Sequence, residues 1–523
     1  MIFFVTNVDN NVEHIIPPIN ISKEVIIRAI NKLNSSKASG PDIVHARIIK
    51  ECCIQFSEIF YLLFRKSLSE GILPTQWKQA NVKALFKKGS RTKCNNYRPV
   101  SLTSIICKLF ESIIRDHILL FLEGSSLISK HQHGFRSGHS CLTQLLEIME
   151  DFTDFYDKHV PYDCIYLDFS KAFDRVPHNR LLSKVYNCGI RGDLFGWISN
   201  FLSNRIQRVV VNGKFSEWNK VTSGIPQGSV LDPLLFTIFI NDIPANIDSC
   251  IKIFADDTKI YNSVSNSNVL SLDLLTLVQW SEKWLLPFNV DKCKVIHYGR
   301  QDDVTVYYMD GRVVSEDTHI KDLGVNFQNN LKFDEHICNI CATANSRLGI
   351  IRNTFHRIEL DGFIILFKAL VRPLLEYCNI IWTPHLKMHN KMIEQIQRRA
   401  TRMIRGMKEL SYTERLRILN LTTLYYRRRR QDVIQVFRII NNIDSNIFED
   451  FFELDLGSTR GNNRKLIKPR ASTSVKLNSF SHRVVNDWNS LPNTVVLSTS
   501  LNCFKSNLNK FWSDIPFKFD FVF

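Results

Sequence analysis

The sequence contains no apolar run long enough to cross a membrane as a helix. Residues 1–5 carry no basic leader and are too short for a secretory signal, so we expect no signal peptide here. The 13 cysteines are spread singly through 523 residues and form no disulfide framework, which predicts reduced thiols. Cys338 and Cys341 form a lone C-x-x-C pair without a second pair at zinc-finger spacing. We therefore expect an intracellular protein, present in nucleus and cytoplasm, that does not act in a membrane.

What the chain does have is positive charge. Lys and Arg total 67, Asp and Glu total 51, and the formal net charge is +16. Nucleic acid is the polyanionic partner that we expect for such a chain. A basic region between Arg398 and Arg438 contains a solid block of four arginines: Arg427, Arg428, Arg429 and Arg430. This block is a candidate nucleic-acid-binding surface, and a solvated helix face or a nuclear-import patch would have the same composition.

The most informative stretch is 251–261, where two adjacent acids follow an alternating apolar pattern. Ile251 and Ile253 fall on one face, and this period of two predicts a strand with a returning partner after Asp257. Asp256 and Asp257 would then lie at the tip of a tight hairpin, where neighbouring carboxylates can approach one centre. Mg²⁺ prefers oxygen ligands and is commonly held by one or two carboxylates plus substrate phosphates. A solvated turn is the other interpretation, because Asp is common in turns.

Two motifs precede this hairpin. Residues 164–169 have the pattern of a buried strand with a carboxylate, Asp168, near its end. A Pro-Gln-Gly loop at 226–228 precedes the apolar run 234–240, and its glycine permits close backbone approach to a flat ligand. Each motif alone would also fit an ordinary strand or a loop-to-helix junction. Together, three carboxylates could hold two metal ions about 3.5–4 Å apart that activate a primer 3′-hydroxyl and stabilise the leaving pyrophosphate.

Basic side chains occur early in the chain. Lys87 lies in a basic turn after the strand predicted within 82–89, and Arg98 follows shortly after. These side chains could grip phosphates, Arg in a bidentate manner, or belong to an ordinary solvated loop. Hydrophobic periodicity predicts helices over 43–70, 102–122, 141–158 and 178–187, and the chain is helix-rich from about residue 329.

In this order the motifs resemble the reverse transcriptases of non-LTR (LINE-type, jockey-like) retrotransposons. The resemblance covers nearly the whole chain, and its stretches are 37–42, 86–89, 96–101, 132–138, 166–178, 223–235, 254–257, 284–293, 319–325, 372–377 and 488–492. It implies an α+β fold shaped as a right hand of fingers, palm and thumb, with an antiparallel palm sheet and a helical C-terminal region. It also implies an RNA-directed DNA polymerase that uses Mg²⁺ or Mn²⁺, an RNA template, a DNA primer and dNTPs.

The resemblance assigns catalytic roles to single residues. Three acids would be the metal ligands: Asp168, Asp256 and Asp257. Lys292 would donate a proton to the pyrophosphate. Phe173, five residues after Asp168, would lie under the incoming sugar and exclude a 2′-hydroxyl. For this reason a viral RNA-dependent RNA polymerase is disfavoured.

Binding roles are implied in the same way. Gln227 and Gly228 would line the pocket for template and nucleotide, while Lys87 and Arg98 would hold the triphosphate. Residues 319–325 would contact the primer. The implied division is a connecting segment at 1–65, fingers and palm at 66–328, a basic helical thumb at 329–445, and a C-terminal segment of unassigned chemistry at 446–523.

The chain also departs from the family pattern. Full-length elements of this kind carry an endonuclease upstream, so we expect a polymerase-containing fragment or a truncated copy. Asp232 stands where the family usually has Gly, and Ser39 replaces a usual Pro. The added acid leaves open a catalytically silent, nucleic-acid-binding relic. A group II intron or retron-type reverse transcriptase is a further alternative. Two features argue against it: residues 488–492 and the absence of a C-terminal zinc-nuclease pattern.

Overall fold

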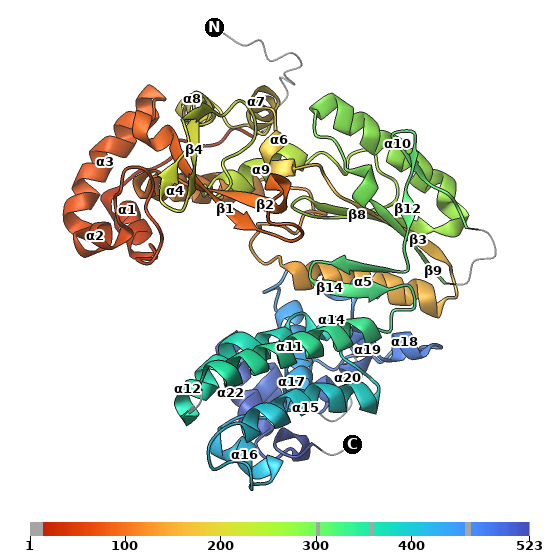
Figure 1. Ribbon diagram of the computed structural model, residues 1–523. Coiled ribbons are helices and arrows are strands. Elements are labelled where there is room, and N and C mark those ends of the chain that lie inside the picture. Colours follow the sequence, from red (N-terminus) through yellow and green to blue (C-terminus); the bar gives the residue numbers. More distant parts are fainter. Residues whose placement is uncertain (1–13, 300–303, 356–358, 456–461, 522–523) are drawn as a thin grey trace.

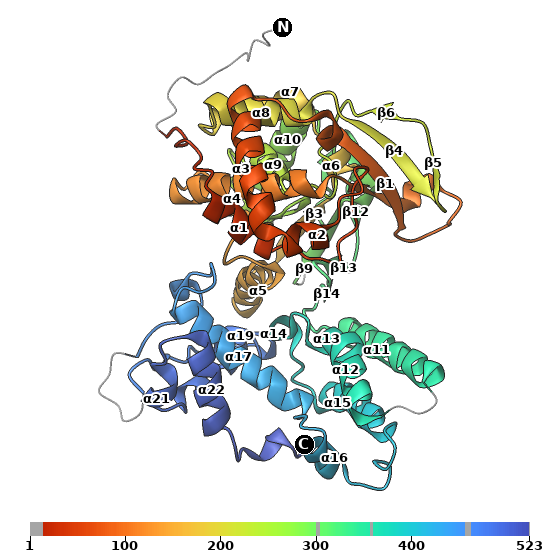
Figure 2. The same cartoon turned by 90° about the vertical axis from the view of Figure 1, so that its left-hand side faces the viewer.

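The computed structural model describes residues 14–299, 304–355, 359–455 and 462–521. Its upper body combines helices with both large sheets, and its lower body is helical (Figure 1). Helix α5 lies where the two bodies meet, and the view at right angles shows the same arrangement (Figure 2). The fold is therefore mixed α and β with a helical C-terminal region, as the sequence predicts.

The helices of the upper body largely follow the predicted periodicity. Residues 102–122, 141–158 and 178–187 correspond to α4 (Ile105–Gly124), α5 (Cys141–Asp157) and α7 (His178–Asn187). The predicted helix over 43–70 divides into α2 (Ala46–Glu51) and α3 (Cys53–Glu70), and α3 continues through the boundary predicted at residues 65 and 66. The other helices of this body are α1 (Lys23–Asn31), α6 (Ala172–Arg175), α8 (Gly192–Leu202), α9 (Asp232–Ile240) and α10 (Ser267–Trp284).

Local sequence explains where several of these helices begin. The Ser140 hydroxyl accepts a hydrogen bond from the Thr143 backbone N–H, and the Thr143 hydroxyl accepts one from the Ser140 backbone N–H, which forms a capping box at α5. Ser104 caps α4 in a simpler way, by accepting from the Cys107 N–H. Such caps satisfy backbone donors that the first turn of a helix leaves free.

One sheet of the upper body has the strand order β2-β1-β4-β5, with β6 also paired to β4. The strands are β1 (Gln79–Phe86), β2 (Tyr97–Leu102), β4 (Ile206–Val211), β5 (Lys214–Phe215) and β6 (Asn219–Lys220). β1 and β2 are antiparallel and pair Leu85 with Arg98, so the basic turn lies at the end of this hairpin.

The central sheet has the order β12-β9-β3-β8-β7. Its strands are β3 (Tyr162–Leu167), β7 (Cys250–Phe254), β8 (Asp257–Ser263), β9 (Lys294–Tyr298) and β12 (Ser315–Glu316). All pairs are antiparallel except β12 with β9, which is parallel. The sheet is therefore mixed, with an antiparallel centre.

Two hydrophobic cores lie on opposite faces of the central sheet. Ile165 and Leu167 of β3 belong to the core under the N-terminal helices. Cys164 and Tyr166 belong to the other core, which includes α5 and the C-terminal helices. Successive side chains of a strand point to opposite faces, so the buried strand β3 joins both cores and fixes the position of the residue that follows it, Asp168.

Two small hairpins precede the lower body: β10 (Tyr308–Met309) with β11 (Arg312–Val313), and β13 (His319–Asp322) with β14 (Val325–Gln328). The lower body contains α11 (Asp334–Thr354), α12 (Leu360–Leu366), α13 (Arg372–Glu376), α14 (Asn379–Trp382), α15 (Lys387–Arg402), α16 (Tyr412–Ile418), α17 (Leu424–Ile440), α18 (Ser474–Leu477), α19 (Phe480–Arg483), α20 (Val485–Asn489), α21 (Asn493–Val496) and α22 (Leu501–Phe511).

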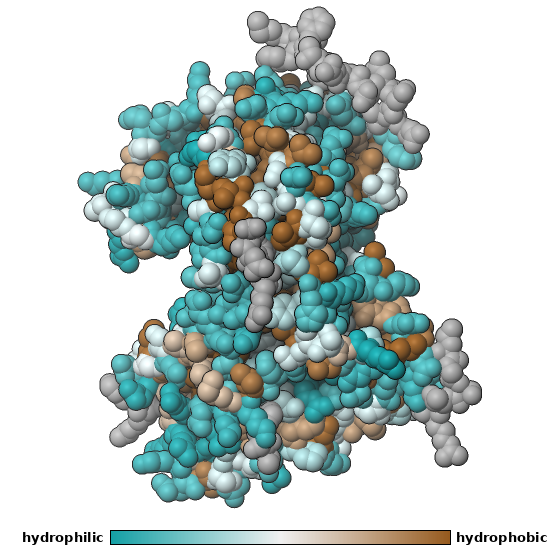
Figure 3. Space-filling model, turned by 90° about the vertical axis from the view of Figure 1, so that its right-hand side faces the viewer, coloured by the Kyte–Doolittle hydropathy of each residue, from teal (hydrophilic) through white to brown (hydrophobic). Residues whose placement is uncertain are grey.

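Hydrophobic residues on the face shown in Figure 3 gather mainly over the upper body, and hydrophilic ones cover most of the lower body. Among the described residues, no helix has the length and apolar character needed to cross a membrane.

Candidate active site

The Asp-Asp pair lies at a hairpin tip, as predicted. β7 and β8 pair Phe254 with Asp257 across a turn made by Ala255 and Asp256. Ala255 has φ +54°, a left-handed conformation that is uncommon for a residue with a side chain. Its backbone N–H donates to the Gln132 Oε1 at 3.1 Å, so a buried carboxamide holds the turn. The sequence marked the loop around Gln132 but gave no signal for this role.

Asp168 directly follows β3, so the strand holds the backbone before it, and a hydrogen bond holds its own carbonyl group. The Asn289 N–H donates to the Asp168 carbonyl at 2.7 Å. The Lys292 Nζ lies 3.1 Å from the Asp168 Oδ2, with the lysine side chain 61% exposed and the aspartate side chain 41% exposed. The structure thus brings together two predicted catalytic residues that are 124 positions apart in the chain.

The three acids act on one another. Desolvation raises the pKa of Asp256, the Asp168 charge raises it further, and Arg98 and Lys87 oppose the increase. Desolvation and the neighbouring Asp256 and Asp322 raise the pKa of Asp257 to about 6, with a smaller contribution from Asp168. Such shifts are expected where like charges crowd together. The predicted metal ligands and the predicted triphosphate-binding cations therefore share one electrostatic site.

The chemistry of these acids suits a hard divalent cation, because carboxylate oxygens are its preferred ligands and a cation would relieve their repulsion. Their present arrangement is not a finished metal site. Across the described ranges, no three His, Cys, Asp or Glu side chains come close enough together to hold an ion. The Asp168 carboxylate is paired with Lys292 in this arrangement.

A cleft of about 1410 Å³ opens in front of the hairpin tip and is lined by β1, β2, β4, the turn before α6 and the Pro-Gln-Gly loop. Six predicted site residues line it: Lys87, Arg98, Phe173, Gln227, Asp256 and Asp257. Asp168, Gly228 and Lys292 are not among its lining residues. Lys83, Arg91 and Lys171 add three cations that we did not predict as site residues. The cleft is thus built from segments far apart in sequence.

Phe173 is held by aromatic packing. Its ring stacks on Phe236 of α9 with centroids 4.2 Å apart and planes inclined by 26°. Its carbonyl accepts a hydrogen bond of 2.9 Å from the Ile225 N–H, which ties α6 to the Pro-Gln-Gly loop. The ring is therefore supported from behind and borders the cleft in front.

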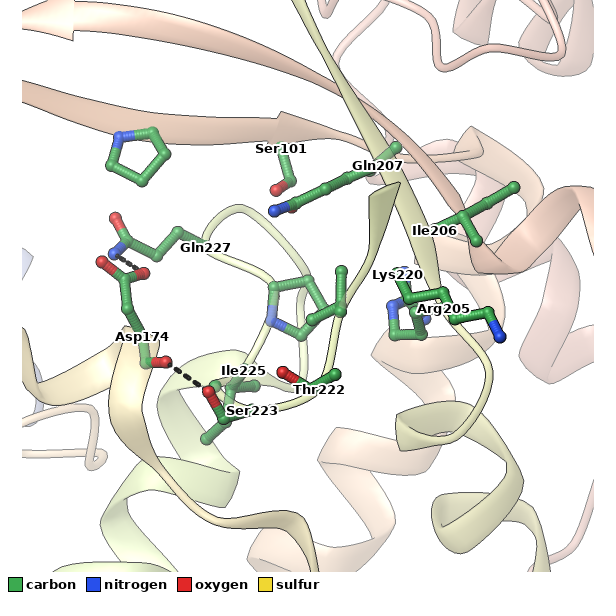
Figure 4. A pocket seen from close by; sticks show the side chains of 15 residues that line it. Ser101, Asp174, Arg205, Ile206, Gln207, Lys220, Thr222, Ser223, Ile225 and Gln227 are labelled. Carbon is green, nitrogen blue, oxygen red and sulfur yellow. Dashed lines mark hydrogen bonds between the residues drawn. The ribbon is translucent and has the colours of Figure 1, made fainter. Parts of the chain in front are cut away.

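The Pro-Gln-Gly loop is fixed on two sides. The Gln227 side chain donates to the Asp174 carboxylate at 2.7 Å, as Figure 4 shows beside an adjoining cavity of about 360 Å³. The Ser101 N–H of β2 donates to the Gln227 carbonyl at 2.7 Å. Gly228 has φ +112°, and a Cβ there would lie 2.7 Å from the Ser101 carbonyl oxygen. Only glycine lets the loop pass this close to β2.

The hairpin of β13 and β14 includes the residues predicted to contact the primer, and Leu323 at its tip lines the cleft. Two side chains outside the hairpin hold it. Lys259 of β8 forms a buried ion pair with Asp322. The Tyr377 hydroxyl, from the segment after α13, donates to the Leu323 carbonyl at 2.8 Å. The sequence gave no sign of either contact.

The arginine block has a different environment from the one predicted. All four residues lie on α17, and each has a partner within the chain. Arg427 pairs with Glu376 and Arg429 with Asp487. Arg428 is 1% exposed and donates to Asn390, and Arg430 donates to Asn509 at 2.8 Å. The geometry therefore gives the block an architectural role, and nucleic-acid binding by these arginines stays a prediction.

Comparison with known proteins identifies a family model that matches the central part of the chain. Residues 86–327 match the family model described as "Reverse transcriptase (RNA-dependent DNA polymerase)". The chain is 28% identical over 403 residues to the RNA-directed DNA polymerase from mobile element jockey of Drosophila melanogaster, with 74% of this chain and 44% of that protein covered.

Other relatives give similar values. The corresponding jockey protein of Drosophila funebris is 28% identical over 75% of this chain and 44% of its own length. The Pol polyprotein from the type-1 retrotransposable element R1 of Bradysia coprophila is 23% identical over 77% of this chain and 41% of its own length. The chain spans less than half the length of each of these curated relatives. Residues 86–327, which contain the hairpin tip, the Pro-Gln-Gly loop and Asp168, thus match the reverse transcriptase family.

Proposed function

We propose that the chain is an RNA-directed DNA polymerase of a non-LTR retrotransposon, which adds dNTPs to a primer 3′-hydroxyl on an RNA template. The observation that carries this proposal is the shared cleft. It combines acids, cations, an aromatic ring and the Pro-Gln-Gly loop from separate segments of the reverse transcriptase domain. This set can position a triphosphate and balance its charge, so no protein nucleophile is needed.

The chemistry at the reacting phosphate follows from the acids. Asp168, Asp256 and Asp257 would hold Mg²⁺ or Mn²⁺, which supplies activation of the primer hydroxyl and stabilisation of the pyrophosphate. Lys292 already lies at the edge of this site through its contact with Asp168. We assign it the proton that the leaving pyrophosphate takes up, because an ammonium group can donate a proton where negative charge develops.

The other residues bind and orient substrates. Lys87 and Arg98, whose charges reach Asp256, would hold the triphosphate. Phe173 would lie against the sugar, while Gln227 and Gly228 would shape the pocket for the nucleotide and its template base. The hairpin tip at Leu323, on the rim of the same cleft, would contact the primer.

In this proposal the molecule is a right hand. Fingers and palm correspond to 66–328, with the central sheet as palm, and the helical thumb corresponds to 329–445. Residues 1–65 would be a connecting segment, and hydrophobic side chains from the described part of 446–523 pack with the thumb in the second core. The template RNA and primer would be attracted by the net charge of +16. Work on retrotransposon RNA and chromosomal DNA would place the protein in both cytoplasm and nucleus.

The test is dTTP incorporation on poly(rA)/oligo(dT) with Mg²⁺ or Mn²⁺. Asp256→Asn should abolish incorporation and leave binding of a labelled RNA/DNA hybrid within about twofold, because it weakens metal coordination only. Asp193→Asn, an exposed acid on α8, is the matched control and should retain full activity. Incorporation by Asp256→Asn at the rate of the control would refute the proposal.

A further inference from the structure

Asp232 is an acid buried in the wall of the cleft. It is the first residue of α9 and lines the cleft together with Phe173, Gln227 and Asp256. Its side chain is 6% exposed, and within the described part of the chain its Oδ1 has no hydrogen-bond partner. A buried polar atom without a partner costs free energy unless a ligand satisfies it. Because Asp232 lines the cleft, a substrate bound there would supply such a ligand.

Three carboxyl groups surround the Pro-Gln-Gly loop here. Glu111 of α4 accepts from the Val230 N–H at 2.7 Å, and Asp174 of α6 accepts from Gln227 at 2.7 Å. Asp232 lies on the third side, where the Gly228 N–H approaches it. The charged groups that act on Asp232 from the packed elements are Glu111 and Asp174, and both are acids.

This environment keeps a proton on Asp232. Burial, together with the smaller effect of the Glu111 and Asp174 charges, raises the pKa of Asp232 to about 8. The Gly228 N–H opposes it, as does the positive end of α9. At neutral pH the carboxyl group is therefore mostly neutral, and it can donate a hydrogen bond as well as accept one.

We propose that Asp232 is a nucleotide-binding residue, which donates a hydrogen bond from its neutral carboxyl group to an acceptor atom of the incoming dNTP. The inference rests on the proposed polymerase function. Once ionised, Asp232 loses the donor and adds negative charge to a wall that faces a triphosphate, so nucleotide binding weakens. A glycine at this position could have neither effect. The alternative is that the Asp232 carboxyl group donates its proton to Glu111 and not to the nucleotide. The Glu111 Oε1 is also buried, and it has no partner among the described residues.

The test measures KM and kcat for dTTP between about pH 6.5 and about pH 9.5 in the wild type, Asp232→Asn and Asp232→Gly. The amide of Asn keeps a donor at every pH. We expect equal KM values for the wild type and Asp232→Asn at low pH. Above about pH 8 the ratio of the wild-type KM to the Asp232→Asn KM should rise by up to about tenfold per pH unit, because the wild-type carboxyl group loses one proton.

The ratio of the two kcat values should stay constant. Asp232→Gly should show a raised KM without the additional rise of the wild type. Superimposable KM profiles for the wild type and Asp232→Asn would overturn the proposal, since they would mean that the proton does not face the nucleotide.

Two further measurements do not need polymerisation. Because the folded-state pKa of about 8 exceeds the ordinary 3.8, the unfolded chain loses this proton first. Wild-type stability relative to Asp232→Asn should fall as pH rises from about 4 to about 8 and then level off. Thermal unfolding of the full chain measures this difference, and a constant difference across that range overturns the proposal.

The second measurement is the anisotropy of a fluorescent dTTP analogue with Ca²⁺, at about pH 7 and about pH 9. Binding should weaken at the higher pH more in the wild type than in Asp232→Asn, and an equal change overturns the proposal. Failure of the polymerase assignment looks different, since the wild type would then incorporate dTTP no better than Asp256→Asn. In that case these two measurements still decide the role of Asp232.

Discussion

The Tyr377 hydroxyl donates a hydrogen bond of 2.8 Å to the carbonyl of Leu323, which joins the C-terminal helical region to the hairpin tip on the cleft rim. The contact is close, because a Cβ on the neighbouring Gly324 would lie 2.9 Å from the tyrosine ring. The glycine therefore lets the ring cover the hairpin turn. Tyr377 thus holds the hairpin proposed to contact the primer, although 54 residues separate it from Leu323.

Tyr377→Phe should weaken productive binding of the primer while keeping the ring in place. A net hydrogen-bond contribution of about 0.5–1.5 kcal/mol corresponds to an increase of about 2- to 12-fold in KM for the primer–template. The KM for dTTP should stay unchanged, because the nucleotide does not touch this contact. Steady-state kinetics with each substrate varied in turn measure both constants. Tyr308→Phe, at an exposed position on β10, is the control, and an equal effect of the two variants would contradict the assignment.

The ion pair of Lys259 and Asp322 should matter for stability. Their side chains are 1% and 3% exposed, so removal of one partner leaves a charge buried without compensation. Lys259→Met should lower the free energy of unfolding by about 3–5 kcal/mol. The double variant Lys259→Met, Asp322→Leu should recover much of that loss. Denaturant titration of all four members of the cycle measures the coupling, and simple additivity would show that the pair contributes no specific interaction.

These contacts show which parts of the molecule could be predicted from sequence. The hairpin at 251–261 was predictable because its signal is local: alternating burial, a two-residue turn and two acids lie within eleven positions. Asp168 was predictable because it follows a short apolar run. By contrast, Lys259 and Asp322 are 63 positions apart, and neither carries a local pattern that names its partner.

The arginine block shows that a local signal can leave the folded environment of its residues unspecified. Its composition predicted a nucleic-acid-binding surface, with a solvated helix face as the alternative, and gave no sign that Arg427 and Arg429 have acidic partners 51 and 58 residues away. Composition counts charges without showing which of them are neutralised by folding. Gln132 was missed for a related reason, because a side chain that supports a turn 123 residues away leaves no periodic signal.

Arg429→Gln should therefore act on stability more than on nucleic-acid binding. Its guanidinium pairs with Asp487, and loss of this charge-assisted contact should reduce the free energy of unfolding by about 1–3 kcal/mol. Arg405→Gln, an exposed arginine after α15, should change it by less than about 0.5 kcal/mol. For Arg429→Gln, the slope of log K against log salt for an RNA/DNA hybrid should equal that of the wild type. A slope flatter by about 1 with unchanged stability would instead identify Arg429 as a phosphate contact.

Sugar choice provides the sharpest test of the cleft. Phe173 follows Asp168 by five residues, and its ring is stacked on Phe236 at 4.2 Å, so it has little freedom to withdraw. A ribose 2′-hydroxyl would meet an apolar ring that offers no acceptor, and it would suffer both a steric clash and the loss of its hydration. Overpacking of this kind typically costs about 1–3 kcal/mol, or about 5- to 150-fold in rate.

Phe173→Val should relieve that clash and raise kcat/KM for UTP relative to dTTP by about that factor, measured on one primed RNA template. Use of dTTP should fall only modestly, because the ring also supports the deoxyribose. Phe511→Val, at an exposed position on α22, controls for a general effect of losing an aromatic ring. If the UTP-to-dTTP ratio stays at its wild-type value while the variant remains active, Phe173 packs against Phe236 as a core residue and does not select the sugar.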